Sequence, residues 1–405
     1  MKLFTYLFIS TALLNISLLA NQNLGLYLPQ KSNTKLTSFY KDGIPFKAMG
    51  INYFDAFQRK LGGEGKKVKL KDYSYVEGFK TLNKYKIPFI RFCAGGFFPN
   101  EWDSYINNKT AYFKAFDQFI KDAEEHNIGL IPTLFWHFPT VPDIVKEPIN
   151  QWGNPDSKTI AFMKQYTQEL ISRYKDSPAI LAWEFGNEWI HEADLPQADL
   201  GRGWIVPHLG TAKTRTMKDK MYRKNIYVAY ETFAEIAKKI DPTRPVFSGD
   251  SIPRPAAYHN RSEASWKIDS IEEWSKIFTL DNSKMSALSA HLYYYDVNEV
   301  ERDVGYIKYD PAEQLALMMD ISRKVGKPLW IGEFGQNGTP KSLQEEKRQF
   351  DYLLNLIIKE DVPLSALWNF DYKHEDQTAW NISEQNHRAY MLKAIQQANK
   401  RLNHE

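Results

Sequence analysis

Short apolar runs alternate with amphipathic stretches along most of this 405-residue chain. The apolar runs have the length of strands, and the stretches between them repeat apolar positions every three to four residues, as helices do. Strands are predicted at residues 46–53, 88–92, 128–135, 180–186, 246–248, 285–290, 328–333 and 365–367, and helices at 75–85, 111–127, 159–174, 225–240, 271–278, 311–325, 343–359 and 391–402. Eight strands, most of them followed by a helix, predict an α/β fold, a single (β/α)8 TIM barrel rather than an open sheet.

Two segments depart from this alternation. The turn signal Asp42-Gly43 lies between short apolar arms at residues 39–46, which predicts an N-terminal β-hairpin that plugs one end of the barrel. Residues 189–217 carry no regular pattern, so we expect a long loop after the fourth strand. The chain contains no Gly/Ser-rich linker and no repeat of fixed period, so we expect one barrel domain.

Two of the predicted strands carry carboxylates. The fourth contains Glu184 and leads directly to Glu188, which is four residues further on and therefore on the same face of an extended segment, and the seventh ends at Glu333. An unpaired charge inside a barrel is costly. These carboxylates therefore belong either to a hydrogen-bonded polar network or to a catalytic site. Because Glu188 lies nearer the strand end, we expect Glu184 to be an interior structural carboxylate.

Polar and aromatic residues recur where the predicted strands end. They are Asn52, Arg91, His137, Asn187, Glu188, His291, Tyr293, Glu333 and Trp368. In a barrel the carboxyl ends of the strands converge on one face, which is the face that carries active sites. A purely stabilising role would place apolar residues there as readily as charged ones, so the pattern favours a functional site.

Composition narrows the class of protein. The net charge is +3 with Lys and Arg scattered, which predicts neither a nucleic-acid nor a membrane-surface partner. The 11 Trp and 23 Tyr fit either a large core or a cleft lined with flat stacking surfaces. Cys93 is the sole cysteine and cannot form an internal disulfide. The sequence shows no zinc-ligand spacing and no phosphate-binding glycine loop, so we expect no cofactor.

The N-terminus has the pattern of a secretory signal peptide. Lys2 precedes an apolar run from Leu3 to Ala20, and polar residues follow it. We predict a signal peptide at residues 1–20, a barrel domain at 21–405 and a secreted or periplasmic protein. A membrane anchor is the alternative, because the run approaches spanning length, but no basic stop-transfer cluster follows directly.

Taken together, these motifs resemble glycoside hydrolase family 5, the cellulase family in a clan of retaining barrel enzymes. The residues that carry the resemblance are Arg91, Asn187-Glu188, Asp241-Pro242-Thr243-Arg244-Pro245, His291-Leu292-Tyr293, Gly332-Glu333-Phe334-Gly335 and Trp368. They extend over nearly the whole mature chain. The segment Trp183 to Glu188 is most similar to the endo-β-1,4-mannanases, in which Asn-Glu is usually followed by Pro-Arg, whereas this chain has Trp189-Ile190.

The resemblance implies retaining hydrolysis of a β-glycosidic bond. Glu188 would be the general acid and then the base, and Glu333 the nucleophile, with the carboxyl groups about 5–5.5 Å apart. The pKa values of two carboxyls so close must be split. Arg91 and Tyr293 would hold Glu333 ionised, and His291 would position the pair.

The remaining strand-end residues would bind the sugar. Asn187 would donate a hydrogen bond to the 2-hydroxyl, an interaction that strengthens in the transition state. The site would be shaped by His137, Trp136, Tyr53, Asn52 and Trp368, with Trp368 as the floor on which the sugar stacks.

We therefore predict a secreted, monomeric hydrolase of β-1,4-linked polysaccharide, with mannan as the first candidate substrate. One alternative is the same chemistry on β-1,4-glucan, or exo-action on short oligomers. Another, of a different class, is an inactive barrel that only binds carbohydrate. If residues 190–216 wall off the cleft, exo-action is favoured, and an open groove favours endo-action.

Overall fold

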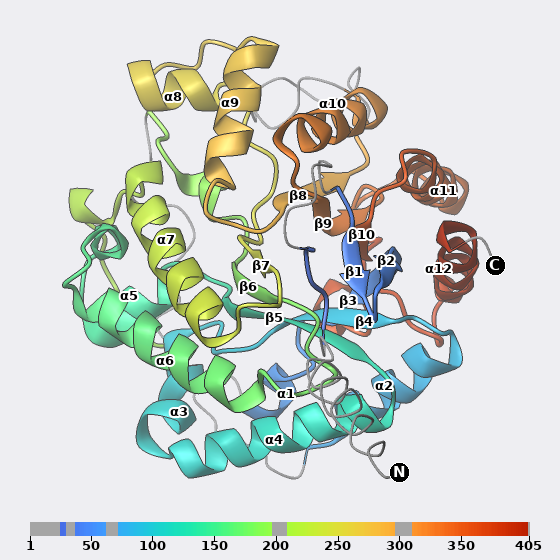
Figure 1. The fold of residues 1–405 in the computed structure, drawn as a ribbon, viewed down its shortest axis with the longest axis horizontal. Coiled ribbons are helices and arrows are strands. Elements are labelled where there is room, and N and C mark those ends of the chain that lie inside the picture. Colours follow the sequence, from blue (N-terminus) through green and yellow to red (C-terminus); the bar gives the residue numbers. More distant parts are fainter. Residues whose placement is uncertain (1–24, 30–36, 62–71, 197–208, 296–309, 404–405) are drawn as a thin grey trace, which may run out of the picture.

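The computed structural model describes residues 25–29, 37–61, 72–196, 209–295 and 310–403. Within them, eight parallel strands form a nearly closed barrel surrounded by helices (Figure 1), which confirms the predicted TIM barrel. The strands are β3 (Ala48–Asn52), β4 (Phe89–Cys93), β5 (Gly129–Phe135), β6 (Trp183–Gly186), β7 (Val246–Phe247), β8 (Leu288–Tyr293), β9 (Leu329–Gly335) and β10 (Leu364–Leu367). β6 and β8 each begin three residues later than predicted.

The strands are hydrogen-bonded in the order β7-β6-β5-β4-β3-β10-β9-β8. The two end strands of this order meet through Ser286, just before β8. Its backbone N–H donates to the carbonyl oxygen of Val246 (2.8 Å), and its Oγ accepts from the Val246 N–H (2.9 Å). The ring is therefore closed by local hydrogen bonds at this seam rather than by a strand ladder.

The helices cover the outside of the barrel. They include α2 (Ser74–Lys84), α4 (Lys109–Glu125), α6 (Lys158–Tyr174), α7 (Arg223–Ile240), α9 (Ile271–Asp281), α10 (Pro311–Val325), α11 (Leu343–Lys359) and α12 (Ala389–Leu402). The bounds of α10 match the prediction because both ends are marked. Asp310 accepts hydrogen bonds from the N–H groups of Ala312 and Glu313, and Gly326 ends the helix at a positive φ of 68°. Short helices in the connections were not predicted: α1 (Gln58–Leu61), α3 (Asp103–Asn107), α5 (Thr140–Val145) and α8 (Ala257–Glu263).

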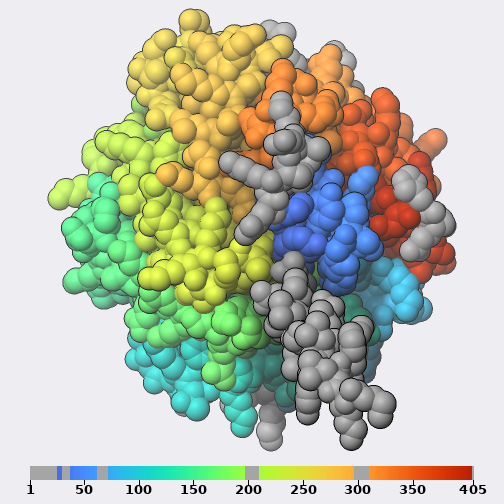
Figure 2. All heavy atoms as spheres, viewed as in Figure 1, coloured from blue at the N-terminus to red at the C-terminus, as the bar shows by residue number. Residues whose placement is uncertain are grey.

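The predicted hairpin consists of β1 (Phe39–Lys41) and β2 (Ile44–Phe46). Phe39 is fully buried and packs against Phe247 of β7, with ring centroids 5.7 Å apart. It shares a core cluster with the first residues of three strands, Ala48, Phe89 and Leu364. The hairpin thus covers the amino ends of the strands, near the middle of the face seen in Figure 2. The carboxyl ends are left for the polar residues.

A β-bulge in β9 decides which side chains face the interior. Ile331 pairs with Ala290 of β8, but Glu333 pairs with the next residue, His291, so Gly332 is an extra residue in β9. With strict alternation Glu333 would face the helices, and the bulge turns it into the barrel. A Cβ on Gly332 would lie 2.9 Å from Nε2 of His291, so the close approach requires glycine.

Only part of the predicted long loop is described. It starts with the short 3-10 helix η3 (Trp189–Glu192) and ends at η5 (Met217–Asp219), and residues 197–208 lie outside the described ranges. The predicted signal peptide, residues 1–20, also lies outside them. None of the helices in the described part of the chain combines the length and apolarity that a membrane crossing requires.

Candidate active site

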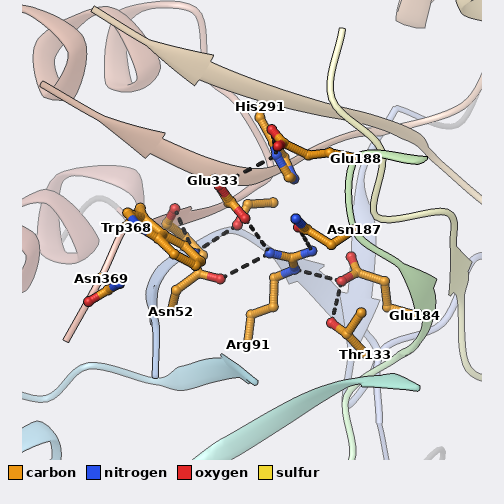
Figure 3. Close-up of polar contacts among 12 residues, drawn as sticks. Asn52, Arg91, Thr133, Glu184, Asn187, Glu188, His291, Glu333, Trp368 and Asn369 are labelled. Carbon is orange, nitrogen blue, oxygen red and sulfur yellow. Dashed lines mark hydrogen bonds and ion pairs between the residues drawn. The ribbon is translucent and has the colours of Figure 1, made fainter. Parts of the chain in front are cut away.

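Glu188 and Glu333 meet at the carboxyl end of the barrel. Glu333 lies in β9, and Glu188 follows β6 by two residues. One carboxylate oxygen of each and a ring nitrogen of His291 all lie within 4.8 Å of one another (Figure 3). A retaining glycosidase needs carboxyl groups about 5–5.5 Å apart, and an inverting one about 6.5–9.5 Å. The separation fits the retaining arrangement.

The backbone around Glu188 is held in an uncommon conformation. Its φ is 55°, in the left-handed region, and its N–H donates to the carbonyl oxygen of Gly249 (3.1 Å). Gly249 itself has a φ of +74°, and a Cβ there would lie 1.9 Å from the carbonyl oxygen of Gly186. The glycine therefore allows the backbone approach that turns Glu188 toward Glu333.

Both oxygens of Glu333 are held by donors. Nη1 of Arg91 donates to Oε1 (2.8 Å), and the hydroxyl of Tyr293 donates to Oε2 (2.6 Å). Burial, together with the charge of Glu333, raises the pKa of Tyr293 well above its ordinary value. Tyr293 therefore keeps its proton and remains a donor to Glu333.

Arg91 connects four neighbours. Its Nε donates to Glu184 (2.5 Å), Nη1 to Glu333 and to Oδ1 of Asn52 (3.2 Å), and Nη2 to Oδ1 of Asn187 (2.8 Å). The side chain is completely buried, which lowers its pKa, but the charges of Glu184 and Glu333 outweigh burial and raise the pKa overall. Asn52 and Asn187 are thus oriented through Arg91, and the amide nitrogen of Asn187 donates no hydrogen bond to a described residue.

Glu184 is the interior structural carboxylate that the sequence predicted. It is fully buried. Besides the bond from Arg91, it accepts hydrogen bonds from Oγ1 of Thr133 (2.6 Å) and from the indole Nε1 of Trp330 (2.7 Å). Three donors from β4, β5 and β9 therefore converge on this carboxylate inside the barrel.

Two imidazoles flank Oε1 of Glu188. Nδ1 of His291 lies 2.8 Å from it and Nε2 of His191 lies 3.7 Å from it. Burial raises the pKa of Glu188, but the hydrogen bonds from His191 and His291 outweigh burial and hold it well below its ordinary value. His191 was not predicted. Its place three residues after Glu188, in a turn of η3, is the signal that identifies it.

Aromatic rings form one wall beside the carboxylates. Trp368, directly after β10, is partly exposed, and its ring lies 6.0 Å from that of the nearly buried Trp136. Trp136 packs on Phe54 (4.8 Å between centroids), and the guanidinium carbon of Arg91 lies 4.4 Å from its ring centroid. Trp368 is therefore the more exposed of the two tryptophans, and Trp136 packs beside it.

Two residues expected in the sugar site are placed elsewhere. Tyr53 is fully buried, and its hydroxyl lies 3.4 Å from Oδ2 of Asp371. Because Asn52 on β3 faces the interior of the barrel, the next residue, Tyr53, faces outward, into the core under α2. His137 is buried against Phe97, with ring centroids 4.7 Å apart and planes within 10°. Burial lowers the pKa of His137 to about 3. Of the two stacked rings, Phe97 is the one that is partly exposed.

Two sets of side chains in the described ranges have the spacing of a cation site. One is Glu188, His291 and Glu333, and the other is His259, Asp269 and Glu273. In the first, the guanidinium of Arg91 already neutralises Glu333. In the second, Asp269 accepts a hydrogen bond from Nδ1 of His259 (2.8 Å) and from backbone N–H groups at the start of α8. Both sets are therefore accounted for by contacts within the chain.

Comparison with known families gives one match over most of the chain. The family described as Cellulase (glycosyl hydrolase family 5) matches residues 54–374. Among curated proteins, mannan endo-1,4-beta-mannosidase F from Aspergillus clavatus is 33% identical over 91 residues. That alignment spans 21% of this chain and 21% of the relative.

Solved structures resemble the whole barrel. The endo-1,4-beta-mannanase from Rhizomucor miehei superposes with a TM-score of 0.62 at 16% identity, covering 94% of this chain and all of that one. The endo-beta-1,4-mannanase from Thermotoga petrophila gives a TM-score of 0.58 at 15% identity, covering 89% of this chain and 78% of that one. At these identities the likeness shows the fold.

Proposed function

This chain belongs to glycosyl hydrolase family 5, and on that premise we propose that it is a retaining endo-β-1,4-mannanase. The observation that carries the proposal is the approach of Glu188 and Glu333, with oxygens within 4.8 Å, at the carboxyl end of the barrel. The supports of Glu333, namely Arg91 and Tyr293, are also in place. An inactive carbohydrate-binding barrel would not need this complete set.

In the proposed reaction Glu333 is the nucleophile. It attacks the anomeric carbon while Glu188 donates its proton to the glycosidic oxygen. The glycosidic bond breaks, a glycosyl–enzyme ester forms on Glu333, and the leaving chain departs with the proton as a free hydroxyl group. In the second step Glu188 takes a proton from water, and the hydroxide formed displaces Glu333. The anomeric configuration is inverted twice and thus retained.

The low pKa of Glu188 in the free protein suits its role as the base of the second step. For the first step Glu188 must carry a proton. A bound glycan covers its exposed surface, 34% of the side chain, and the added desolvation raises its pKa. We therefore expect protonation of Glu188 to accompany substrate binding.

The residues around the pair bind and orient the sugar. Asn187, held by Arg91 through its Oδ1, is free to donate from Nδ2 to the 2-hydroxyl. Trp368 is the stacking floor, because the C–H groups of a sugar face suit an aromatic ring. His291 orients Glu188 through Nδ1. Asn52 acts on Arg91 rather than on the sugar.

Mannan is the proposed substrate because the similar proteins named above are described as mannanases. β-1,4-Glucan is the competing substrate, since the family is described as Cellulase. The test is hydrolysis of mannan, glucomannan and carboxymethyl cellulose, with the products resolved by length. Mannan cut into a ladder of oligomers supports an endo-mannanase, faster cutting of cellulose supports a glucanase, and release of single sugars supports exo-action.

The catalytic roles are tested by substitution. Glu333→Ala should abolish turnover with the fold intact, and Glu188→Ala should slow substrates with poor leaving groups most, because only those need the proton. Glu125→Ala on the outside of α4 is the control, since this exposed carboxylate faces solvent. Hydrolysis at the wild-type rate by either catalytic variant would refute the assignment, and NMR of the first product would reveal its anomeric form.

We also propose that the protein is exported after removal of residues 1–20 and acts as a monomer. The support is the order of Lys2, the apolar run and the polar residues after Ala20. N-terminal sequencing of the protein from the culture medium or periplasm tests the cleavage, and light scattering tests the monomer. A protein retained in the membrane with an intact N-terminus contradicts export.

A further inference from the structure

The loop after β10 brings a third carboxylate to the sugar site. Glu375, in the short 3-10 helix η7 (Lys373–Glu375), accepts hydrogen bonds at Oε2 from the indole Nε1 of Trp368 (3.0 Å) and from Nδ2 of Asn369 (2.8 Å). Both donors directly follow β10, and Asn369 is fully buried. One oxygen of Glu375 thus fixes the edge of the proposed stacking floor.

The other oxygen of Glu375 has no such partner in the described part of the chain. No described residue donates a hydrogen bond to Oε1, and the side chain is partly exposed. A pyranose stacked on Trp368 projects its equatorial hydroxyls outward, past the edge of the indole. The carboxylate bound to the indole N–H lies at that edge. Oε1 is therefore placed to meet a sugar hydroxyl rather than the sugar face.

The electrostatic surroundings make this oxygen responsive to pH. Burial and the charge of Glu333 raise the pKa of Glu375 to about 7, although the bonds from Trp368 and Asn369 act in the opposite direction. The titratable groups nearby are Glu333 on β9, Tyr293 on β8, and Tyr372, Lys373 and His374 on its own loop. The charge of Glu375 in turn contributes to the raised pKa values of Tyr293 and Tyr372.

We propose that Glu375 is a positioning and specificity-determining residue of the sugar site. Its Oε2 orients the Trp368 indole, and its Oε1 accepts a hydrogen bond from a hydroxyl of the sugar stacked there. This inference rests on the proposed function. It also defines the substrate class further, because a sugar whose hydroxyl at that edge is esterified or missing has no donor to offer and leaves a partly buried acceptor unpaired.

The test compares Glu375→Gln and Glu375→Ala, with Asp376→Asn as the matched control from the next position of the same loop. The probe is a β-1,4-linked manno-oligosaccharide, with kcat and KM measured from pH 5 to pH 9. Glu375→Gln keeps an acceptor for the indole but loses the charge, so KM should rise about tenfold with a smaller change in kcat. Glu375→Ala loses both contacts and should raise KM further, whereas the control should match the wild type.

The pH profile separates binding from a merely structural role. In the wild type KM should fall about three- to tenfold as pH rises through about 7, because ionised Glu375 is the stronger acceptor. In Glu375→Gln this step should vanish. An unchanged KM, or a step that persists in Glu375→Gln, overturns the inference.

Failure of this inference and failure of the proposed function give different results. If hydrolysis depends on Glu333 but Glu375→Gln behaves as the wild type, only the role of Glu375 is wrong. If the wild type hydrolyses no β-glycan, the proposed function is wrong, and the binding of mannohexaose measured by calorimetry then tests the role of Glu375. Equal affinity in the wild type and in Glu375→Gln overturns the inference, whereas about tenfold weaker binding by Glu375→Gln supports it. Melting temperatures verify that each variant is folded. If the Ala variant does not fold, the comparison of the wild type with the near-isosteric Gln variant still tests the inference.

Discussion

Replacing Glu184 with Gln should destabilise the barrel strongly while leaving catalysis only weakened. Glu184 is fully buried and accepts from Arg91 and Thr133 at one oxygen and from Trp330 at the other. In the variant one oxygen becomes an NH2 group. If that group faces Trp330, two donors oppose each other and the indole N–H is left unpaired, while Arg91 loses one of its two carboxylates.

The size of the effect follows from these contacts. An unsatisfied buried donor costs about 1–3 kcal/mol, and breaking a buried ion pair costs about 3–5 kcal/mol. These overlap, because Arg91 keeps its bond to Glu333, so we expect about 3–5 kcal/mol in total. For a chain of 405 residues, an unfolding entropy of about 2.1 cal/mol/K per residue gives about 0.85 kcal/mol/K, so the Tm should fall by about 4–6 °C.

Thermal unfolding and steady-state kinetics on the same preparations measure both effects. We expect kcat/KM to fall about tenfold, because Arg91 loses an anchor but Glu184 touches no substrate. Glu346→Gln is the matched control: Glu346 is equally buried and pairs with Arg388, so it should lower Tm similarly without affecting kcat/KM. An unchanged Tm in Glu184→Gln, or a loss of activity as complete as in Glu333→Ala, would refute the reasoning.

Three further predictions concern single contacts. Tyr293→Phe removes the donor 2.6 Å from Glu333, so kcat/KM should fall about 10- to 100-fold with little change in Tm; a rate near that of the wild type contradicts it. His191→Leu removes one imidazole from Glu188 and so raises its pKa, which should move the descending, alkaline limb of the kcat profile to higher pH; an unmoved limb argues against contact between the two in solution. Asp250 is buried, which raises its pKa to about 7, and a carboxyl that binds its proton more tightly in the folded state costs stability as pH rises from about 4 to about 7. In Asp250→Asn the Tm relative to wild type should therefore rise across that window and level off above it, and a difference that is constant with pH would count against this.

The barrel could be predicted because each strand is an apolar run and each helix an amphipathic one. The predicted strand boundaries were wrong where a strand carries polar residues into the site or lacks a ladder partner. β8 continues to Tyr293, beyond the predicted end, because His291 and Tyr293 face a polar interior and do not look like a buried strand. Residues 180–182 are apolar, but they form an isolated bridge between Ile180 and Leu130 instead of a strand ladder before β6 begins.

The approach of Glu188 and Glu333 could also be predicted, since both carboxylates lie at strand ends that must converge. Alternation along a strand could have excluded Tyr53, because it is adjacent to Asn52 and only one of them can face inward. Loops have no such period. His191 and Glu375 reach the site from short 3-10 helices in these loops. The three-residue spacing from Glu188 makes His191 a candidate, but the sequence does not predict the turns themselves, and the contacts of both residues depend on tertiary packing.

The extra glycine in β9 has a consequence for how this protein can change. Point mutations alter the side chain at a position but not the number of residues in the strand, so they leave residue 333 on the inside. Loss of the single codon for Gly332 would remove the bulge and restore the regular pleat. Glu333 would then directly follow Ile331, which faces the helices, and would still point into the barrel. The inward direction of Glu333 is thus robust both to substitution in β9 and to a three-nucleotide deletion of its extra residue.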